Sequence, residues 1–396
     1  MEHLNTWNLL GVAVAMAISA TITALFPRLP VPGSVLEIVL GVLLGPQVLH
    51  VLAPGPASSL FSLLGLAMLF LMAGFEMNPA ILSGRPIRNA LVGWCLSAVI
   101  ALGAAWVLVA AGLAGAPLMT GLAMTTTAIG ALLPALRDAA LLSPPYGPMV
   151  LAAGAVGEAG PVIILSLVLA EEARTLLEVV MMIGFAAAAI GAVVLAARSK
   201  HAAFAAIVER SIGKSGQFPV RLAVCILIIL MVISIRLSID IVLAAFVAGA
   251  LVRALVPPDQ HEALSTRFDA VGYGFLVPIF FIISGVNLDV ATLFSNPLAF
   301  CMVPLYAVFM LVVRGLPALL IYRADLPFPN CVSLALHSGT QLPLVVAITA
   351  IAVGRGVMPG GQAAALVGAG IVTMLLFPAL ARSSFGHQTN LSDSQP

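Results

Sequence analysis

The sequence contains little charge. Only 8% of its 396 residues are Asp, Glu, Lys or Arg, and the formal net charge is +1. This balance argues against a nucleic-acid partner, because proteins that bind DNA or RNA neutralise phosphates with clustered Lys and Arg. Hydrophobic residues make up 61% of the chain, which is more than a soluble protein of this length could bury in one core. The composition therefore predicts an all-α polytopic membrane protein surrounded by the lipid bilayer.

Several enzyme motifs are missing as well. The sequence has no Walker A segment, no Rossmann glycine fingerprint, no zincin motif and no nucleophile elbow. Its four cysteines lie in apolar segments without metal-ligand spacing, so we interpret them as small core residues. We therefore expect no enzyme, no cofactor and no nucleotide-binding domain. If the protein transports a solute, an ion gradient rather than ATP would supply the energy.

Long apolar segments dominate what is present. Thirteen segments of about 17–28 residues, separated by Pro, Gly and charged residues, are long enough to cross a bilayer core of roughly 30 Å as helices. They cover residues 7–26, 32–48, 57–78, 86–111, 115–137, 146–170, 175–198, 219–236, 239–256, 268–286, 295–322, 329–353 and 361–382.

The distribution of Lys and Arg predicts the orientation of these helices. If the N-terminus lies outside, thirteen of the 17 cations fall on the cytoplasmic side and three on the other side. The remaining cation, Arg314, lies inside segment 295–322. Because cytoplasmic loops carry an excess of Lys and Arg, we expect the N-terminus outside and the C-terminus inside.

An odd number of helices with the two ends on opposite sides suits two inverted repeats joined by an extra helix. The similar stretches FLMAGFEMN (70–78) and FIISGVNLD (281–289) close segments three and ten, 211 residues apart. A plan of this kind is typical of secondary transporters. We expect a first repeat with a linking helix at 1–197, a cytoplasmic linker at 198–218, a second repeat at 219–382, and a disordered cytoplasmic tail at 383–396.

Polar residues interrupt two segments that are related by the same seven-helix offset. MTTTAIG (124–130) lies in the fifth segment and HSGTQLP (337–343) in the twelfth. Paired breaks in the two halves of a transporter indicate its binding site. Alternatively, the hydroxyls only bond back to their own helices, as is common in membrane spans. The residues that we expect at the breaks are Thr125, Thr126, Thr127, His337, Ser338, Thr340 and Gln341.

An acidic residue, Glu158, lies in the segment that follows the first break. It is surrounded by Gly154, Gly157, Gly160 and Pro161, which allow neighbouring backbones to approach closely. A carboxylate at this depth faces a cavity, pairs with a cation or stays protonated. These options suit a group that binds a proton and a metal cation, Na⁺ or K⁺, in alternation. The structural alternative is a neutral Glu158 that is hydrogen-bonded to a neighbouring helix.

Arg314 is the basic residue that lies well inside a segment. We expect it to compensate charge, either at the ends of the broken helices or beside an empty Glu158. The alternative is an arginine that snorkels to the cytoplasmic surface, since Arg323 lies only nine residues further along.

Other ionisable residues are weaker candidates. Glu37 and Glu76 lie within about two turns of a membrane surface and are possible entrance or packing groups, and Asp138 is expected at the cytoplasmic mouth. His337 titrates near physiological pH when it is unperturbed, but a buried, neutral histidine is an equally good interpretation.

Several stretches together resemble a known family over nearly the whole chain. This is the monovalent cation:proton antiporter-2 family, the Kef-type branch of the sodium/proton exchangers. The stretches are LEIVLGVLLGP (36–46), MLFLMAGFEMN (68–78), TTTAI (125–129), LAAFVAGALV (243–252) and PIFFIISGVNLD (278–289).

The resemblance implies thirteen helices, a homodimer, and a six-helix core in which two discontinuous helices cross beside an acidic pair. The second acid of the pair falls on Glu158, whereas the first falls on Gly157, which has no carboxylate. A single carboxylate implies electroneutral one-for-one exchange, a different substrate or a loss of antiport. The family's basic residue matches Arg314. The regulatory nucleotide-binding domain of Kef-type potassium systems does not occur in this sequence.

The sequence thus predicts an antiporter of the cytoplasmic membrane that exchanges a monovalent cation for protons. Glu158 would bind either ion, with hydroxyls of Thr125, Thr126 and Thr127 as further oxygen ligands. One alternative is a potassium efflux channel or uniporter on the same fold. Another is a carrier of small organic anions, in which Arg314 and the N-termini of the broken helices would hold the substrate.

Overall fold

The computed structural model describes residues 6–26, 31–76, 84–130, 132, 136, 141–170, 191, 195, 211, 217–237 and 241–392. All regular secondary structure in these residues is helical. Within them, nine helical segments are long and apolar enough to cross a membrane, and two shorter apolar helices cover Gly33–Leu44 and Ile241–Leu255. This confirms the expected all-α polytopic class. The number of thirteen helices and their orientation stay predictions, since most of segment 175–198 and most of the linker 198–218 lie outside the described residues.

The chain divides into two compact units. The first comprises Met1–Gly55, Pro79–Pro161 and Phe281–Pro396, and the second comprises Pro56–Asn78 and Val162–Phe280. Each unit therefore draws on both of the expected sequence repeats. Compactness and repeat symmetry are different properties, so the repeat boundaries stay a prediction.

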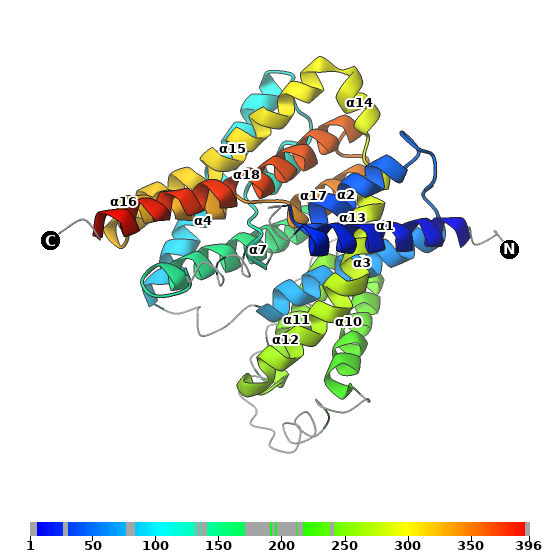
Figure 1. The fold of residues 1–396 in the computed structure, drawn as a ribbon, viewed down its shortest axis with the longest axis horizontal. Helices are drawn as coiled ribbons and strands as arrows, with labels where there is room; N and C mark the ends of the chain where they lie inside the picture. Colours follow the sequence, from blue (N-terminus) through cyan, green and yellow to red (C-terminus); the bar gives the residue numbers. More distant parts are fainter. Residues whose placement is uncertain are drawn as a thin grey trace. The chain divides into compact units, whose positions relative to one another are not determined.

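The first unit contains the interrupted helices and most of the helices that surround them (Figure 1). Within it, α15 packs against α4, α16 and α18, and α17 packs against α5 and α18. Its helices are α1 (Thr6–Leu25), α2 (Gly33–Leu44), α4 (Gly84–Ala110), α5 (Pro117–Met124), the greater part of α7 (Tyr146–Ala170), the end of α13 (Val277–Val286), α14 (Val290–Ser295), α15 (Pro297–Ile321), η3 (Tyr322–Ala324), α16 (Phe328–Ser338), α17 (Pro343–Gly354) and α18 (Gly360–Ser392).

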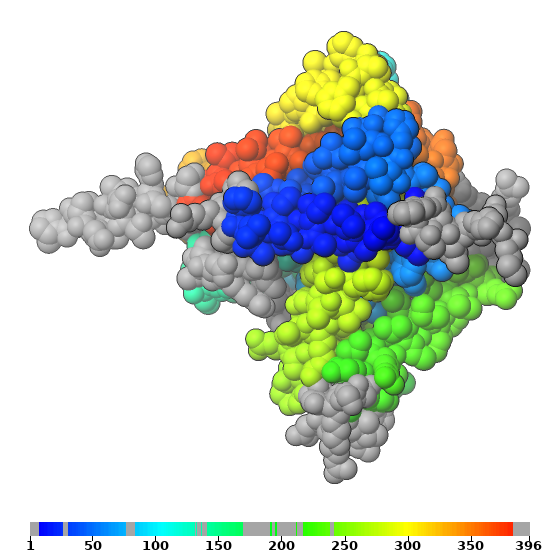
Figure 2. Space-filling model, turned by 45° about the vertical axis from the view of Figure 1, so that its right-hand side comes forward, coloured from blue at the N-terminus to red at the C-terminus, as the bar shows by residue number. Residues whose placement is uncertain are grey.

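Helix α1 forms part of the molecular surface in the view of Figure 2 (dark blue). This helix packs beside α2 on one face. On its other face it exposes large aliphatic side chains, including Leu9, Leu10 and Val14. Exposing such an apolar face to water is unfavourable, whereas lipid acyl chains are equally apolar. The exposed face of α1 therefore suits contact with the bilayer.

The second unit is built around two closely packed helices, α3 (Pro56–Glu76) and α11 (Ile241–Leu255). Gly74 of α3 lies against the carbonyl of Phe246, and Gly249 of α11 lies against the carbonyl of Leu71, so neither position has room for a side chain. Small residues of this kind let helices approach closely inside a membrane. The unit also includes α10 (Phe218–Arg236), η1 (Pro258–Gln260), α12 (His261–Val271), the π-helical η2 (Gly272–Leu276) and the first residues of α13.

The C-terminal helix is longer than expected. α18 runs from Gly360 to Ser392, whereas the sequence predicts a disordered tail from Ser383. No proline follows Pro378 before Ser392 to interrupt the backbone. Once a helix has formed, each added residue gains a hydrogen bond without a new nucleation cost. The helix therefore propagates beyond its apolar part.

Candidate ion-binding site

The fifth predicted segment is interrupted where its threonines lie. α5 ends at Met124, the backbone is non-helical from Thr125 to Ala128, and helical structure resumes at Ile129. The interruption frees backbone groups that must find partners inside the membrane. The N–H of Thr127 donates to the carbonyl of Gly157 at 3.1 Å, and the N–H of Ala128 donates to the carbonyl of Thr340 at 2.9 Å.

The twelfth predicted segment is interrupted in the same way. α16 ends at Ser338 and α17 begins at Pro343, with Gly339 to Leu342 between them. Pro343 explains the position of the restart, because proline disfavours a helical conformation in the residue before it and is well tolerated in the first turn of a helix. Both helix breaks expected from the sequence are therefore present.

The two breaks contact each other directly. The hydroxyl of Thr127 donates to the carbonyl of Ser338 at 2.7 Å. The amide Nε2 of Gln341 donates to the carbonyl of Met124 at 2.9 Å, and its Oε1 lies 3.3 Å from the hydroxyl of Thr126. Each break thus satisfies polar groups of the other. We call this contact region the crossing, defined by residues 125–128 and 339–342.

Some hydroxyls at the breaks also bond locally, as the alternative interpretation proposed. Thr125 donates to the carbonyl of Leu122 at 2.8 Å, and Thr340 donates to that of Leu336 at 3.0 Å. The Thr126 hydroxyl lies 3.0 Å from the carbonyl of Ala123. Local bonding and interrupted helices therefore occur together. The lone pairs of these hydroxyl oxygens still provide acceptor capacity.

Glu158 lies on α7 beside the first break. Its Oε1 accepts a hydrogen bond of 3.2 Å from the backbone N–H of Gly130, in the first turn of the resumed helix, and the side chain is half-buried. The N-terminus of a helix favours a carboxylate, because its free N–H groups carry partial positive charge. The backbone of the preceding residue, Gly157, accepts the bond from Thr127. One turn of α7 thus lies directly against the first break.

Arg314 projects from α15 into the crossing and does not snorkel to the surface. The residue is only 4% exposed. Its Nε and Nη2 donate to the Thr127 hydroxyl oxygen at 3.1 and 2.9 Å. Further bonds of 3.2–3.4 Å reach the carbonyls of Ala153 and Ser338 and the hydroxyl of Ser97. The guanidinium therefore connects α4, α7 and both breaks.

Gly157 stands where the family resemblance places the first acid, and it has no free space around it. A β-carbon here would lie 2.5 Å from the Thr127 hydroxyl and 2.7 Å from Nη2 of Arg314. Real Cβ atoms essentially never approach other atoms so closely. The guanidinium and the threonine thus occupy the space that a first carboxylate would need.

His337 belongs to a hydrogen-bonded group at the end of α16. Its Nδ1 lies 2.9 Å from the Tyr146 hydroxyl and 3.3 Å from that of Ser333, and all three residues are buried. This is the buried, hydrogen-bonded histidine of the alternative interpretation. Tyr146 and Ser333 were not singled out from the sequence, although the spacing of four between Ser333 and His337 places them on one helix face.

Thr373 of α18 is a further polar residue that the sequence analysis did not single out. Its hydroxyl lies 3.1 Å from both the backbone N–H and the carbonyl of Gln341. The only signal for it was a hydroxyl in the mostly apolar segment 361–382. Thr373 satisfies backbone groups that the second break leaves without intrahelical partners.

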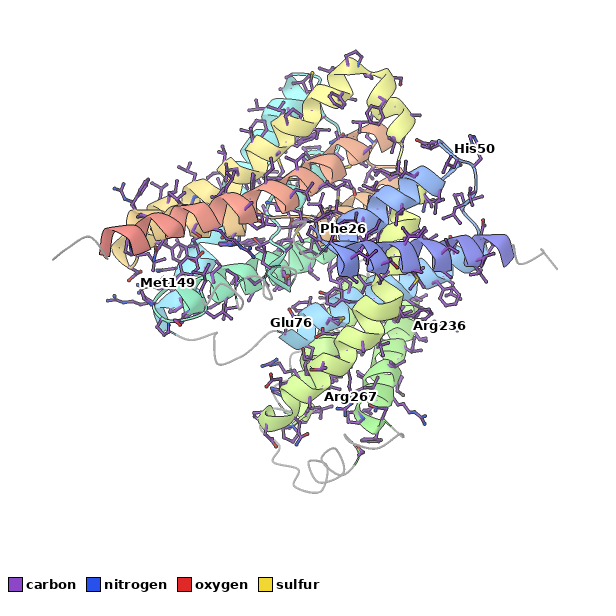
Figure 3. All side chains as sticks on the ribbon, in the orientation of Figure 1. Phe26, His50, Glu76, Met149, Arg236 and Arg267 are labelled. Atoms are coloured by element: carbon purple, nitrogen blue, oxygen red, sulfur yellow. The ribbon has the colours of Figure 1, made fainter. Side chains whose placement is uncertain are left out.

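The remaining candidates lie elsewhere. Glu37 is half-buried on α2, where its carboxylate reaches back to Gly33 at the start of the same helix. Glu76 ends α3 in the second unit (Figure 3). Near it, Nη1 of Arg253 donates to the carbonyl of Phe75 at 2.7 Å. Asp138 lies outside the described residues. Among those residues, no group of three or more His, Cys, Asp or Glu side chains could hold a metal ion.

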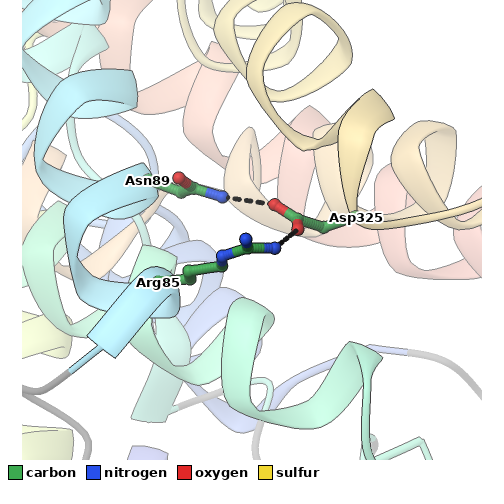
Figure 4. Close-up of polar contacts among 3 residues, drawn as sticks. All are labelled: Arg85, Asn89 and Asp325. Carbon is green, nitrogen blue, oxygen red and sulfur yellow. Dashed lines mark hydrogen bonds and ion pairs between the residues drawn. The ribbon is translucent and has the colours of Figure 1, made fainter.

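A polar contact joins the helices that carry Ser97 and Arg314. Asp325, just after η3, accepts a hydrogen bond of 2.8 Å from Nδ2 of Asn89 and lies 3.5 Å from Nη1 of Arg85 (Figure 4). The Arg85 side chain is 76% exposed, so this ion pair contributes little to stability. The Asn89 bond, which is partly buried, holds the start of α4 against the end of α15.

The sequence matches one family model and two curated relatives. The model, described as "Sodium/hydrogen exchanger, transmembrane", matches residues 14–382. The first relative, "Putative Na(+)/H(+) antiporter YjbQ" of Bacillus subtilis, is 25% identical over 81% of this chain and 53% of its own length. The second, "Probable Na(+)/H(+) antiporter 3" of Methanocaldococcus jannaschii, is 21% identical over 71% of this chain and 72% of its own length. The chain therefore spans about half the length of the Bacillus relative.

A solved structure shares the fold. The sodium proton antiporter MjNhaP1 from Methanocaldococcus jannaschii, determined at pH 8, superimposes with a TM-score of 0.64 and 16% identity over 96% of this chain and 97% of that one. None of these matches singles out the Kef-type branch that the sequence motifs resemble. They agree at the level of the whole family, and the apolar helices agree with them. The chain belongs to the sodium/hydrogen exchanger family of multi-pass membrane transporters.

Proposed function

We propose that the protein exchanges a monovalent cation, Na⁺ or K⁺, for protons across the cytoplasmic membrane, and that Glu158 binds both ions in turn. The observation that carries this proposal is the position of Glu158 beside the crossing, where it accepts the Gly130 N–H. Membership of the exchanger family supports cation and proton substrates. In keeping with the family resemblance, we also propose a homodimer with the N-terminus outside.

One carboxylate is enough to couple the two fluxes. A protonated Glu158 has lost the charge that attracts a cation, and a bound cation excludes the proton. Because an ionised group deep in a membrane is costly, an empty and charged Glu158 is disfavoured during the change of access. The carrier would therefore cross loaded with one ion or the other, which is the requirement for exchange.

Neutral oxygens complete the proposed site. The Thr127 hydroxyl oxygen already accepts two bonds from Arg314, and a hydroxyl oxygen has two lone pairs. We therefore assign Thr127 to positioning Arg314, and we assign the hydroxyls of Thr125 and Thr126 to binding the cation with Glu158. One carboxylate with neutral oxygens suits a monovalent ion better than Ca²⁺, which takes six to eight oxygen ligands, usually with several carboxylates.

Two considerations bear on which ion is carried. Both curated relatives are named as Na⁺/H⁺ antiporters, which favours Na⁺. The sequence motifs resemble the Kef-type branch, which includes potassium systems, and this keeps K⁺ as a candidate.

The test uses purified protein in liposomes with an imposed pH gradient and an internal pH indicator. Addition of Na⁺ or K⁺ is expected to collapse the gradient, and the ion that is effective at the lower concentration is the substrate. Protein-free liposomes provide the control for leak. Cation flux without proton movement would favour the efflux channel or uniporter instead. No response to Na⁺, K⁺ or Li⁺ from inserted, folded protein would refute the proposal.

Competition at one carboxylate predicts how the rate depends on pH. Protons and cations exclude each other, so more cation is needed at lower pH. Once the site is near saturation, each tenfold rise in cation concentration should move the acid limb of the pH–rate profile about one pH unit toward acid. Initial rates at several cation concentrations measure the shift. An acid limb that stays fixed would mean that the two ions use separate sites.

A single carboxylate also predicts electroneutral exchange. One cation exchanged for one proton moves no net charge, so a membrane potential should leave the final ion distribution unchanged. By contrast, transfer of one net charge per cycle would shift that distribution about 50-fold at 100 mV. Liposomes with an imposed potential and matched ion gradients distinguish these cases. A shift of the second size would show that another charged group takes part.

A further inference from the structure

Arg314 carries a buried charge with unusual surroundings. In the described part of the chain, its hydrogen-bond partners are hydroxyls and backbone carbonyls, all of them neutral. Burying an ion without an opposite charge costs several kcal/mol even when its hydrogen bonds are made. At the position where the family resemblance places the first acid, this chain has Gly157, and a β-carbon there would lie 2.7 Å from Nη2 of Arg314. The charge on Arg314 therefore calls for compensation from another source.

A small cavity adjoins the guanidinium on the side of α4. Its volume is about 10 Å³, which is room for about one small guest. Its polar lining residues are Trp94 and Ser97 of α4, Arg314 of α15, Tyr322 of η3 and Ser338 of α16. All of its lining residues belong to the first unit.

Two polar atoms of the lining residues lack partners. Nε1 of Trp94 and the hydroxyl of Tyr322 are buried and have no hydrogen bond among the described residues. Tyr322 as a whole is only 2% exposed. Buried polar groups nearly always have a partner, so each of these exceptions requires an explanation. The indole N–H can only donate, as can the guanidinium, and the Tyr322 hydroxyl is able to donate. The Ser97 hydroxyl already donates to the carbonyl of Gly93 at 2.9 Å. The shared requirement is therefore an acceptor.

We propose that this cavity binds one small monovalent anion, such as chloride. A chloride ion accepts hydrogen bonds from several directions and supplies the negative charge that Arg314 lacks. A water molecule could donate to the Tyr322 hydroxyl oxygen, but it would leave the guanidinium charge unbalanced. Carboxylates of small organic acids satisfy the same donors but need more space than this volume gives.

An acidic residue near Tyr322, one of the lining residues, does not strongly oppose the binding of an anion. Asp325 interacts electrostatically with Tyr322. Its two oxygens are engaged, however, one with Asn89 at 2.8 Å and the other with Arg85 at 3.5 Å. Arg85 offsets the charge of Asp325.

The anion would hold the Arg314 guanidinium, which binds Thr127. Chloride would therefore stabilise the crossing without itself being transported.

The experiment measures binding apart from transport. Detergent-solubilised protein is dialysed against radiolabelled chloride, and its thermal unfolding is followed while NaCl replaces sodium gluconate at constant ionic strength. We expect one chloride per chain and an unfolding midpoint that rises with chloride concentration, as for any ligand that binds only the folded state. Gluconate is too large for the cavity and serves as the reference anion.

Trp94→Phe removes the indole donor and should weaken chloride binding about 10- to 150-fold, because a hydrogen bond to a charged group contributes about 1.5–3 kcal/mol. Tyr322→Phe should act in the same direction and is useful if Trp94→Phe folds poorly. Trp106→Phe, on an exposed part of the same helix, should leave the affinity unchanged.

Three outcomes would overturn the proposal. The first is that no chloride is bound and the unfolding midpoint does not depend on chloride, which would mean that water fills the cavity. The second is that both Phe variants bind chloride as tightly as the unchanged protein. The third is that the protein binds formate but not chloride. Because no ion flux is measured, failure of the exchange proposal would leave this result intact, and the reverse also holds.

Discussion

Replacement of Glu158 by Gln should abolish cation-dependent proton movement while leaving the protein folded and inserted. The amide oxygen can still accept the Gly130 N–H, so the local structure keeps its hydrogen bond. The negative charge is lost, and with it the group that holds either ion. Removing one member of a partly buried charge pair costs about 3–5 kcal/mol, which corresponds to cation binding weaker by a factor of about 150 or more.

The measurement is the collapse of an imposed pH gradient in liposomes, with protein insertion confirmed for each variant. Glu262→Gln is the matched control, because Glu262 is an exposed carboxylate on α12 in the second unit. Glu158→Asp keeps the charge but shortens the side chain by one methylene, so partial exchange with a weaker apparent cation affinity is expected. Full exchange by Glu158→Gln would show that another residue carries the ions.

Replacement of Gly157 by Ala should damage both the stability and the activity of the protein. The new β-carbon would lie 2.5 Å from the Thr127 hydroxyl and 2.7 Å from Nη2 of Arg314, so one of them must move. Overpacking of this kind costs about 1–3 kcal/mol. Because the same displacement breaks charge-assisted bonds at the crossing, we also expect exchange to slow at least about tenfold. Thermal unfolding and gradient collapse measure the two effects.

Gly103→Ala is the matched control for this substitution. Gly103 lies in α4, and a β-carbon added there would have no atom within 4 Å, so alanine should be neutral or slightly stabilising. Gly157→Asp, which restores the acid of the family pattern, should be no better tolerated than Gly157→Ala, since its β-carbon meets the same atoms. A fully stable and active Gly157→Ala variant would mean that Thr127 and Arg314 adjust easily, and that the crossing is looser than its hydrogen bonds indicate.

The sequence predicted the features that contrast with their apolar surroundings. Threonines in segment 115–137 and the polar stretch before Pro343 marked both helix breaks, and a lone carboxylate marked Glu158. In a membrane span, each such residue is costly unless it has a function or a partner. The composition alone was sufficient to identify the fold class, because few soluble proteins contain so many long apolar segments.

The pairing of distant residues could not be predicted in this way. Thr127 and Arg314 are 187 residues apart, and Tyr146 and His337 are 191 apart. No local pattern specifies which polar side chain meets which across a bundle of similar helices. For the same reason the sequence marked Gly157 only as a missing acid. Its role as the place where a guanidinium and a threonine meet α7 required the positions of three helices.

The division into two compact units could not be predicted from the sequence either. The first unit takes its helices from both ends and the middle of the chain, and the second takes its helices from two separate stretches. Hydropathy identifies segments that enter the membrane but carries no information about their neighbours. The branch within the family was also beyond the reach of short motifs, since apolar helices resemble one another by chance.

The direct bonds between the two breaks limit how this part of the molecule can move. An interrupted helix usually offers a hinge, at which one half swings while the other stays still. Here the hydroxyl of Thr127 is bonded to Ser338, Ala128 to Thr340, and Gln341 to Met124, so a swing at either break would pull on the other. The two breaks therefore cannot bend independently of each other. An ion held beside them would travel with the crossing as a single rigid body, and opening to either side of the membrane would then depend on displacement of that whole body.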